Sequence, residues 1–129
     1  MNSEPHRLLV VDDDEPSREL AVAIFESAGW MVEQAESGRH ALARLSDHRP
    51  DCVLLDISMP GMSGEEVCRR IRSDPGLAGL RVVAYTAHAF PEDVESLRAA
   101  GFDAVAVKPC VIEALVAAVE NSAASQQPN

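Results

Sequence analysis

Five polar residues suited to phosphate chemistry each stand directly after a short apolar run. Three of them are carboxylates, one is a lysine and one is a threonine. They are Asp12 and Asp13 after Leu8–Val11, Asp56 after Cys52–Leu55, Thr86 after Leu80–Tyr85, and Lys108 after Ala104–Val107. Carboxylate oxygens bind hard divalent cations, and a lysine ammonium or a threonine hydroxyl donates hydrogen bonds to phosphate oxygens. If the fold brings these residues together, they form a phosphate site.

The charge of such a cluster limits what it binds. Two like charges about 4 Å apart repel by roughly 4 kcal/mol at an effective dielectric near 20, so three clustered carboxylates need partners. Lys108 offsets one of these charges. A divalent cation would cancel the two that remain, and Mg²⁺ suits oxygen ligands while it keeps water molecules that a phosphate can replace. The residue types therefore predict a Mg²⁺-dependent phosphate site.

A carboxylate such as Asp56 also accepts a phosphoryl group, forming an acyl phosphate, when nearby cations neutralise the transferring group. Each residue has a plainer interpretation when it is taken alone. Acidic residues at a helix start favour the helix dipole, and this is the role we expect for Asp14. Taken singly, Asp56 could be a turn residue, Lys108 an exposed lysine and Thr86 a strand-end residue. Their combination favours the phosphate site.

The elements that must position these residues alternate along the chain. The apolar runs named above predict four strands, and Met31–Ala35 predicts a weaker one. Helix signals lie between the strands: Pro16 and Gly29, the cap Ser37, the capping box Ser63 and Glu66, and then Pro91 and Gly101. A last helix would carry Ile112, Leu115, Val116 and Val119 on one face.

Five strands alternating with five helices predict an α/β domain with a doubly wound parallel sheet, because parallel strands require crossover connections. In such a sheet, ligands bind beyond the carboxyl ends of the strands, near the point where the strand order reverses. All five polar residues stand at those ends. The predicted fold therefore allows them to share one edge.

Length and composition indicate one globular domain. The 129 residues, 47% hydrophobic and 25% charged, allow a single core. We expect an N-terminal tail over residues 1–6, the domain over 7–121 and a flexible C-terminal tail over 122–129. The first residues lack a secretory signal, and no apolar run is long enough to span a bilayer, so we expect a cytoplasmic protein. The net charge of −10 argues against direct binding to nucleic acid or anionic membranes and favours protein partners.

The cysteines and histidines do not suggest a second metal site. Cys52, Cys68 and Cys110 are odd in number and lie among apolar neighbours, which favours reduced, packed thiols. The histidines show no ligand spacing with one another or with the cysteines.

Four segments together resemble the response-regulator receiver family of two-component signalling. They are Leu9–Asp14, Asp56–Gly64, Tyr85–Ala89 and Val107–Pro109, and they occur in the family's order and spacing. The resemblance implies a flavodoxin-like sheet with strand order 2-1-3-4-5. It also implies a signalling module, not an enzyme acting on a separate substrate, that catalyses its own phosphotransfer and dephosphorylation.

The resemblance also implies a role for each matching residue. Asp13 would hold Mg²⁺ directly, Asp12 largely through water, and the backbone carbonyl of Ser58 would complete the metal shell with Asp56. Asp56 would accept the phosphoryl group, and Lys108 and a moving Thr86 would contact its oxygens. The Lys108–Pro109 bond would be cis. A histidine kinase or histidine phosphotransfer protein would be the donor, an unknown protein would receive the output, and the chain would be a monomer or a weak homodimer.

Some positions depart from the family's pattern or vary within it. Val105 occupies a position where many members carry an aromatic switch residue, and Cys110 one where an aromatic often follows the proline. Ser58 and His88 stand at variable positions that tune attack by water on the acyl phosphate, although simple loop exposure is an equal interpretation for His88.

Two other functions are alternatives. Val105 and the lack of an attached output domain suggest a degenerate receiver that acts as a phosphorylation-independent scaffold. A phosphohydrolase of the haloacid-dehalogenase kind also uses an aspartate after its first strand. Its motif differs from Asp12–Asp14, however, which leads into Glu15 and Pro16.

Overall fold

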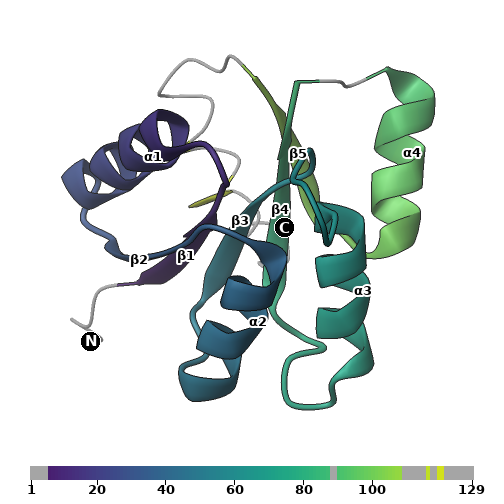
Figure 1. The fold of residues 1–129 in the computed structure, drawn as a ribbon, viewed down its shortest axis with the longest axis horizontal. Helices are drawn as coiled ribbons and strands as arrows, with labels where there is room; N and C mark the ends of the chain where they lie inside the picture. The colour runs from purple at the N-terminus through teal and green to yellow at the C-terminus, as the bar shows by residue number, and fades with distance from the viewer. Residues whose placement is uncertain (1–5, 88–89, 109–115, 117–118, 121–129) are drawn as a thin grey trace, which may run out of the picture.

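The structure is a computed structural model that describes residues 6–87, 90–108, 116 and 119–120 (Figure 1). Strands and helices alternate along this part of the chain. They are β1 (Arg7–Val11), α1 (Glu15–Ser27), β2 (Met31–Ala35), α2 (Gly38–Asp47), β3 (Cys52–Asp56), α3 (Gly64–Ser73), β4 (Arg81–Thr86), α4 (Pro91–Ala100) and β5 (Ala104–Val107).

The five strands form one parallel sheet in the order β2-β1-β3-β4-β5, which confirms the predicted topology. The chain moves from β1 outward to β2 and then crosses to β3 on the other side of β1. The strand order therefore reverses between β1 and β3. In the register Val11 pairs with Leu55, so the residues that follow β1 lie beside the end of β3.

Each sheet face is covered by a different set of helices. Alternate residues of a strand point to opposite faces, so Leu9 and Val11 belong to the core cluster that residues of α2, α3 and α4 also form, whereas Leu8 and Val10 belong to the cluster with residues of α1. Figure 1 shows α1 apart from the group formed by α2, α3 and α4. Strands buried on both faces explain the continuous apolar runs in the sequence.

The predicted caps fix the starts of three helices. The side chains of Asp14, Ser37 and Ser63 each accept a hydrogen bond from the backbone N–H three residues ahead. The helix-start role expected for Asp14 is therefore confirmed. Only the serine half of the predicted capping box forms, because the Glu66 carboxylate accepts a hydrogen bond from Arg70 instead. At the end of α4, Gly101 has a φ of 110°, which favours glycine.

Four of the five predicted helices lie in the described part of the chain. The fifth falls mostly on residues 109–115, 117–118 and 121 onward, outside that part, as do Ile112, Leu115, His88, Pro109 and Cys110. Val119 is described, is buried, and packs in the cluster beneath α1. Nearby, the indole N–H of Trp30 donates to the Glu120 carboxylate over 3.2 Å.

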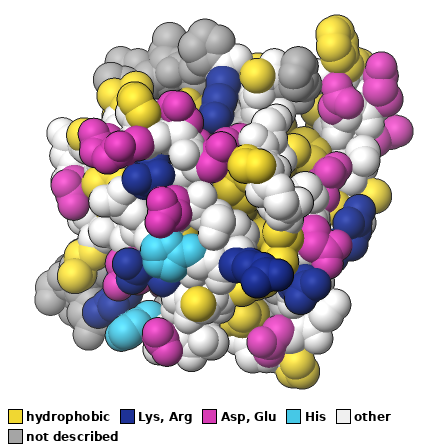
Figure 2. All heavy atoms as spheres, in the orientation of Figure 1, with side chains coloured by type: hydrophobic (Ala, Val, Ile, Leu, Met, Phe, Trp, Pro, Cys, Tyr) yellow, Lys and Arg dark blue, Asp and Glu magenta, His cyan; other side chains and the backbone are white. Residues whose placement is uncertain are grey.

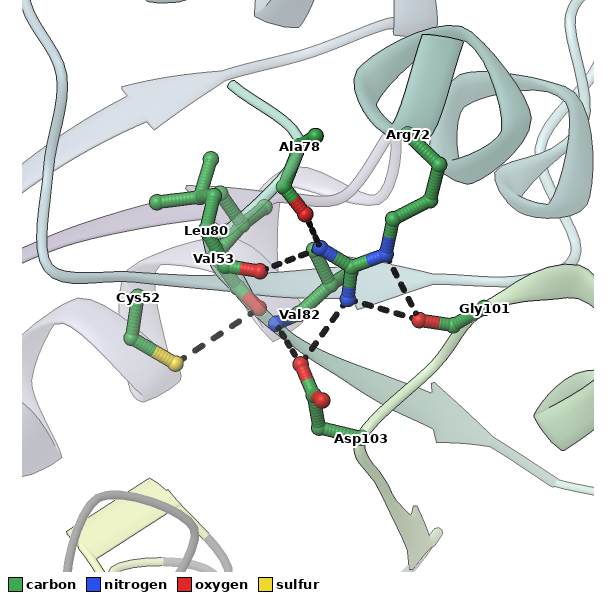
Figure 3. A network of polar contacts seen from close by, with 8 residues as sticks. All are labelled: Cys52, Val53, Arg72, Ala78, Leu80, Val82, Gly101 and Asp103. Atoms are coloured by element: carbon green, nitrogen blue, oxygen red, sulfur yellow. Dashed lines mark hydrogen bonds and ion pairs between the residues drawn. The ribbon is translucent and has the colours of Figure 1, made fainter. Parts of the chain in front are cut away.

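A polar cluster centred on Arg72 lies at the amino ends of β4 and β5, opposite the edge where the predicted phosphate site lies (Figure 3). We call it the Arg72 cluster; it comprises Arg72, Ala78, Leu80, Val82, Gly101 and Asp103. The Arg72 guanidinium donates to the backbone carbonyls of Ala78, Leu80 and Gly101 and to Oδ2 of Asp103. The same Oδ2 accepts the Val82 N–H over 2.9 Å. One arginine thus ties the end of α3 to the loops that enter β4 and β5, a role that the sequence analysis missed.

Candidate functional site

Asp12, Asp13 and Asp56 converge at the carboxyl ends of β1 and β3, where the strand order reverses. Each contributes a carboxylate oxygen, and these three oxygens lie within 4.8 Å of one another. Asp12 and Asp56 are buried, at 2% and 5% exposed, whereas Asp13 is exposed. The predicted grouping of these three carboxylates is thus present.

The carboxylate of Asp12 is held by donors from its own loop and from α1. Oδ1 accepts the Asp14 N–H over 2.9 Å, and Oδ2 accepts the Ser17 hydroxyl over 2.7 Å. The Asp12 backbone is also fixed, because its N–H donates to Ala35 and its carbonyl accepts from Arg18. Asp12 is therefore fixed in place by protein contacts alone.

Asp56 is the last residue of β3 and lies against the start of α3. Its Oδ1 accepts the Ser58 N–H over 3.2 Å. A β-carbon added at Gly64 would lie 2.7 Å from the Asp56 carbonyl oxygen and 2.9 Å from Cα of Ile57. Only glycine allows α3 to begin this close to the backbone of Asp56.

Lys108 lies between the two buried carboxylates. Its Nζ is 3.5 Å from Oδ2 of Asp12 and 3.4 Å from Oδ1 of Asp56. The same Nζ lies 4.8 Å from the centre of the Tyr85 ring, close enough for a cation–π interaction. The Lys108 N–H donates to the Thr86 carbonyl over 2.7 Å, which anchors the residue beyond β5. Lys108 is also the only lysine in the sequence.

The electrostatics of this site favour an added cation. Burial raises the pKa of Asp56 above its ordinary value; Lys108 and the Ser58 N–H oppose that rise, and Asp12 adds to it. Three carboxylates face one lysine, so the protein does not balance the charge by itself. Hard oxygen donors around an excess negative charge fit Mg²⁺.

The remaining predicted site residues border the acidic triad. Thr86 is 3% exposed at the end of β4. Ser58 is exposed and reaches Asp56 through its backbone N–H, while the metal-binding role of its carbonyl stays a prediction. A pocket of about 340 Å³ lies beside them, lined among others by Ser58, Thr86 and Phe90.

Sequence reasoning missed three contributors to the site: Ser17, Arg18 and Tyr85. The spacing from Asp12 to Ser17 carries no signal, because only the turn into α1 brings the hydroxyl back to the carboxylate. Tyr85 belongs to a predicted strand and to one of the segments that resemble the family, but nothing in the sequence indicates that its aromatic ring lies beside Lys108. Val105, at the position where many members of the family carry an aromatic, is half-buried and packs against the core beneath α4.

The surface around these elements carries charges of both signs. Figure 2 shows acidic side chains spread over one face, with Lys and Arg side chains interspersed among them. Among the described residues, no helix combines the length and apolar character needed to cross a bilayer.

Comparison with known proteins agrees with this site and fold. Residues 8–120 match the family described as the response regulator receiver domain. The response regulator MprA of Mycolicibacterium vanbaalenii is 42% identical over 117 residues, which cover 88% of this chain and 48% of MprA. The polar-differentiation response regulator DivK of Brucella anthropi is 31% identical, over 91% of this chain and 95% of DivK. The chain thus spans about half the length of MprA and nearly all of DivK.

Solved structures give the same result. The chemotaxis protein CheY4 of Vibrio cholerae superposes with a TM-score of 0.84 at 30% identity, over 88% of this chain and 94% of CheY4. The matched family is one of signalling domains, which removes the basis for the phosphohydrolase alternative. The family match, the sheet order and the acidic triad agree, and this chain belongs to the response regulator receiver domain family.

Proposed function

We propose that this chain accepts a phosphoryl group on Asp56 in a Mg²⁺-dependent reaction and thereby switches its contacts with other proteins. The observation that carries the proposal is the convergence of Asp12, Asp13 and Asp56 around Lys108 at the strand-order reversal. Receiver domains interact with histidine kinases. The proposed donor is therefore a histidine kinase or a histidine phosphotransfer protein, and the proposed location is the cytoplasm.

In the proposed reaction, a carboxylate oxygen of Asp56 attacks the phosphorus of the donor. The bond between phosphorus and the donor's leaving atom breaks, and a mixed anhydride forms on Asp56. When bound to Asp12, Asp13, Asp56 and the Ser58 carbonyl, Mg²⁺ would supply positive charge to the transferring oxygens. Lys108 is close enough to Asp56 to contact those oxygens without a large movement.

Thr86 and its surroundings would convert this reaction into a surface change. Thr86 borders the pocket that separates the end of β4 from the start of α4. Movement of its hydroxyl toward a phosphoryl group on Asp56 would alter that pocket and the position of Phe90, which is 64% exposed. The proposed output is a changed affinity for a partner protein.

Intact mass measurement after incubation with Mg²⁺ and acetyl phosphate tests the proposal. We expect one added phosphoryl group on the native protein and none on Asp56→Asn or in the presence of EDTA. Asp47→Asn is a matched control, because Asp47 is an exposed aspartate at the end of α2. A native protein that stays unmodified while a known receiver is modified in parallel would contradict the proposal.

A phosphorylation-independent scaffold is the alternative that Val105 favours. Val105 packs against the core cluster and has no aromatic ring that could report phosphorylation by rotating. A pull-down with beryllofluoride-treated and untreated protein separates the two functions. Partners that bind both forms and Asp56→Asn equally would support the scaffold, whereas partners selective for the treated form would support the switch.

A further inference from the structure

The hydroxyl of Ser17 makes the shortest polar contact to the Asp12 carboxylate. It donates to Oδ2 over 2.7 Å, whereas Lys108 Nζ lies 3.5 Å from the same oxygen. Asp12 is 2% exposed, so water does little to satisfy its charge. The hydroxyl therefore supplies a hydrogen bond that the buried carboxylate needs.

This contact is separate from the capping of α1. Ser17 is the third residue of α1, and its backbone N–H already donates to the Asp14 side chain over 3.0 Å. Its hydroxyl turns back toward β1 instead of bonding to the helix backbone. A serine used only for helix initiation would not need this orientation.

Arg18, the next residue, fixes the main chain of Asp12. Its Nη1 donates to the Asp12 carbonyl over 2.9 Å, and its Nε donates to the Gln34 side chain over 3.0 Å. The first turn of α1 is thus tied to both β1 and β2 around Asp12. With the main chain held by Arg18, the Asp14 N–H on Oδ1 and the Ser17 hydroxyl on Oδ2 together fix the direction of the carboxylate, and of these two donors Ser17 is the side chain of α1.

We propose that Ser17 is a positioning residue for the metal site. It holds Asp12 in the orientation in which the ligand oxygens of the three aspartates lie within 4.8 Å of one another. This inference rests on the proposed function, since it assigns Ser17 a part in Mg²⁺ binding. A carboxylate oxygen has more than one acceptor position, so the bond from Ser17 leaves Asp12 able to hold a metal-bound water.

The test compares Mg²⁺ binding by the native chain, Ser17→Ala and Ser17→Thr. Loss of a hydrogen bond that orients a metal ligand typically weakens metal affinity by 10- to 100-fold, and we expect about 10-fold for Ser17→Ala. Ser17→Thr keeps the hydroxyl, so its Mg²⁺ affinity should lie within about 3-fold of the native value. A difference of that size is smaller than the effect of losing one hydrogen bond. Calorimetric titration with Mg²⁺ measures these affinities directly.

The Mg²⁺ dependence of phosphoryl uptake provides a second measurement, which a purely structural role of Ser17 would leave unchanged. Ser17→Ala should need about 10-fold more Mg²⁺ for half-maximal uptake from acetyl phosphate and reach a near-native rate at saturating Mg²⁺. Ser73→Ala is the matched control, because the Ser73 hydroxyl is exposed and donates to the Arg69 carbonyl of its own helix α3. Circular dichroism and urea unfolding confirm that each variant is folded.

The outcomes separate the inference from the proposed function. If the native chain binds Mg²⁺ and accepts phosphate but Ser17→Ala binds as tightly, the inference is wrong and the function stands. Tighter binding by Ser17→Ala would also overturn it, because the hydroxyl would then compete with the metal. If the native chain itself neither binds Mg²⁺ nor accepts phosphate, the proposed function fails.

Discussion

The two ends of the sheet carry polar clusters of opposite design. At the carboxyl end, three carboxylates face one lysine, whose ammonium lies 3.4 and 3.5 Å from two of them. At the amino end, Arg72 pairs with one carboxylate, Asp103, over 2.9 Å, and its other donors meet backbone carbonyls. Every nitrogen of the Arg72 guanidinium donates a hydrogen bond and its charge is matched by one carboxylate, whereas the carboxyl end carries an excess of negative charge.

The difference in charge balance indicates that the amino-end cluster has a structural role and that the carboxyl-end cluster has a chemical one. A satisfied cluster stabilises the loops it connects and has no need of a ligand. A cluster with excess negative charge lowers the stability of the fold, and binding of a cation to the folded state raises that stability again. Substitutions at the carboxyl end should therefore change reactivity more than stability, and those at the amino end should do the reverse.

The largest effect is expected from Lys108→Met at the carboxyl end. Removing one preorganised cation from a reacting group typically costs about 100-fold or more in rate, and we expect that loss in phosphoryl uptake from acetyl phosphate. Lys108→Arg should retain more of the rate, because it keeps the charge. A rate for the methionine variant within a few-fold of the native rate would show that Lys108 does not contact the phosphoryl group.

The largest stability effect is expected from Arg72→Ala at the amino end. This change leaves Asp103 and three backbone carbonyls without the guanidinium, and we expect a loss of about 2–3 kcal/mol in the free energy of unfolding. Urea unfolding measures it. The control is Arg69→Ala, which removes an exposed ion pair between Arg69 and Glu66 on the same helix. This change should lower the free energy of unfolding by less than about 1 kcal/mol. Equal losses in the two variants would contradict a special role for Arg72.

Removing one carboxylate should raise the stability of the fold at the carboxyl end of the sheet and lower it at the amino end. Because burial raises the pKa of Asp56, its folded state binds a proton more tightly than its unfolded state, and this group's contribution to stability falls as pH rises above about 3.8. In EDTA at pH 7, the free energy of unfolding of Asp56→Asn should therefore exceed that of the native chain by on the order of 1 kcal/mol. This gain should disappear near pH 4.

Asp103→Asn is the counterpart of that substitution at the amino end. It should destabilise the fold at pH 7, because it removes the charged partner of Arg72. Urea unfolding of both variants in the same buffer tests the comparison. Two changes of the same sign would mean that the ends of the sheet do not differ as described.

The smallest effect concerns two thiols buried in the body of the domain. Burial raises the pKa of Cys52 to about 12 and that of Cys68 to about 11, from an unfolded value of 9.0. The folded thiols hold their protons where the unfolded ones lose them, so stability should decline as pH rises above 9.0. Urea unfolding at pH 8 and pH 10 follows this decline, which should be smaller in Cys68→Ala.

A thiol reagent gives an independent check of the same burial. In a Cys110→Ala background at pH 8, native protein should not react with Ellman's reagent, and urea-unfolded protein should release two equivalents. The two free cysteines of the described residues are both buried, as the apolar sequence around them predicted. Rapid labelling of the folded protein would show that the core opens near β3 or α3.

Much of this protein follows from the sequence alone. The continuous apolar runs and the caps Ser37 and Ser63 determined the order of strands and helices, because burial on both faces and helix capping are local demands on residue type. Strand ends in a parallel sheet share one edge, so the positions of Asp12, Asp13 and Asp56 after their strands already indicated that they meet. The receiver family was recognisable from the same residues.

Only the tertiary structure decided how the two ends of the sheet are held. The turn into α1 brings Ser17 back to Asp12, and Arg72 reaches Gly101 and Asp103 from a helix about thirty positions earlier. No local pattern records such contacts, because they depend on where separate elements come to lie. Sequence spacing identified the residues that react, whereas packing determined the residues that hold them in place.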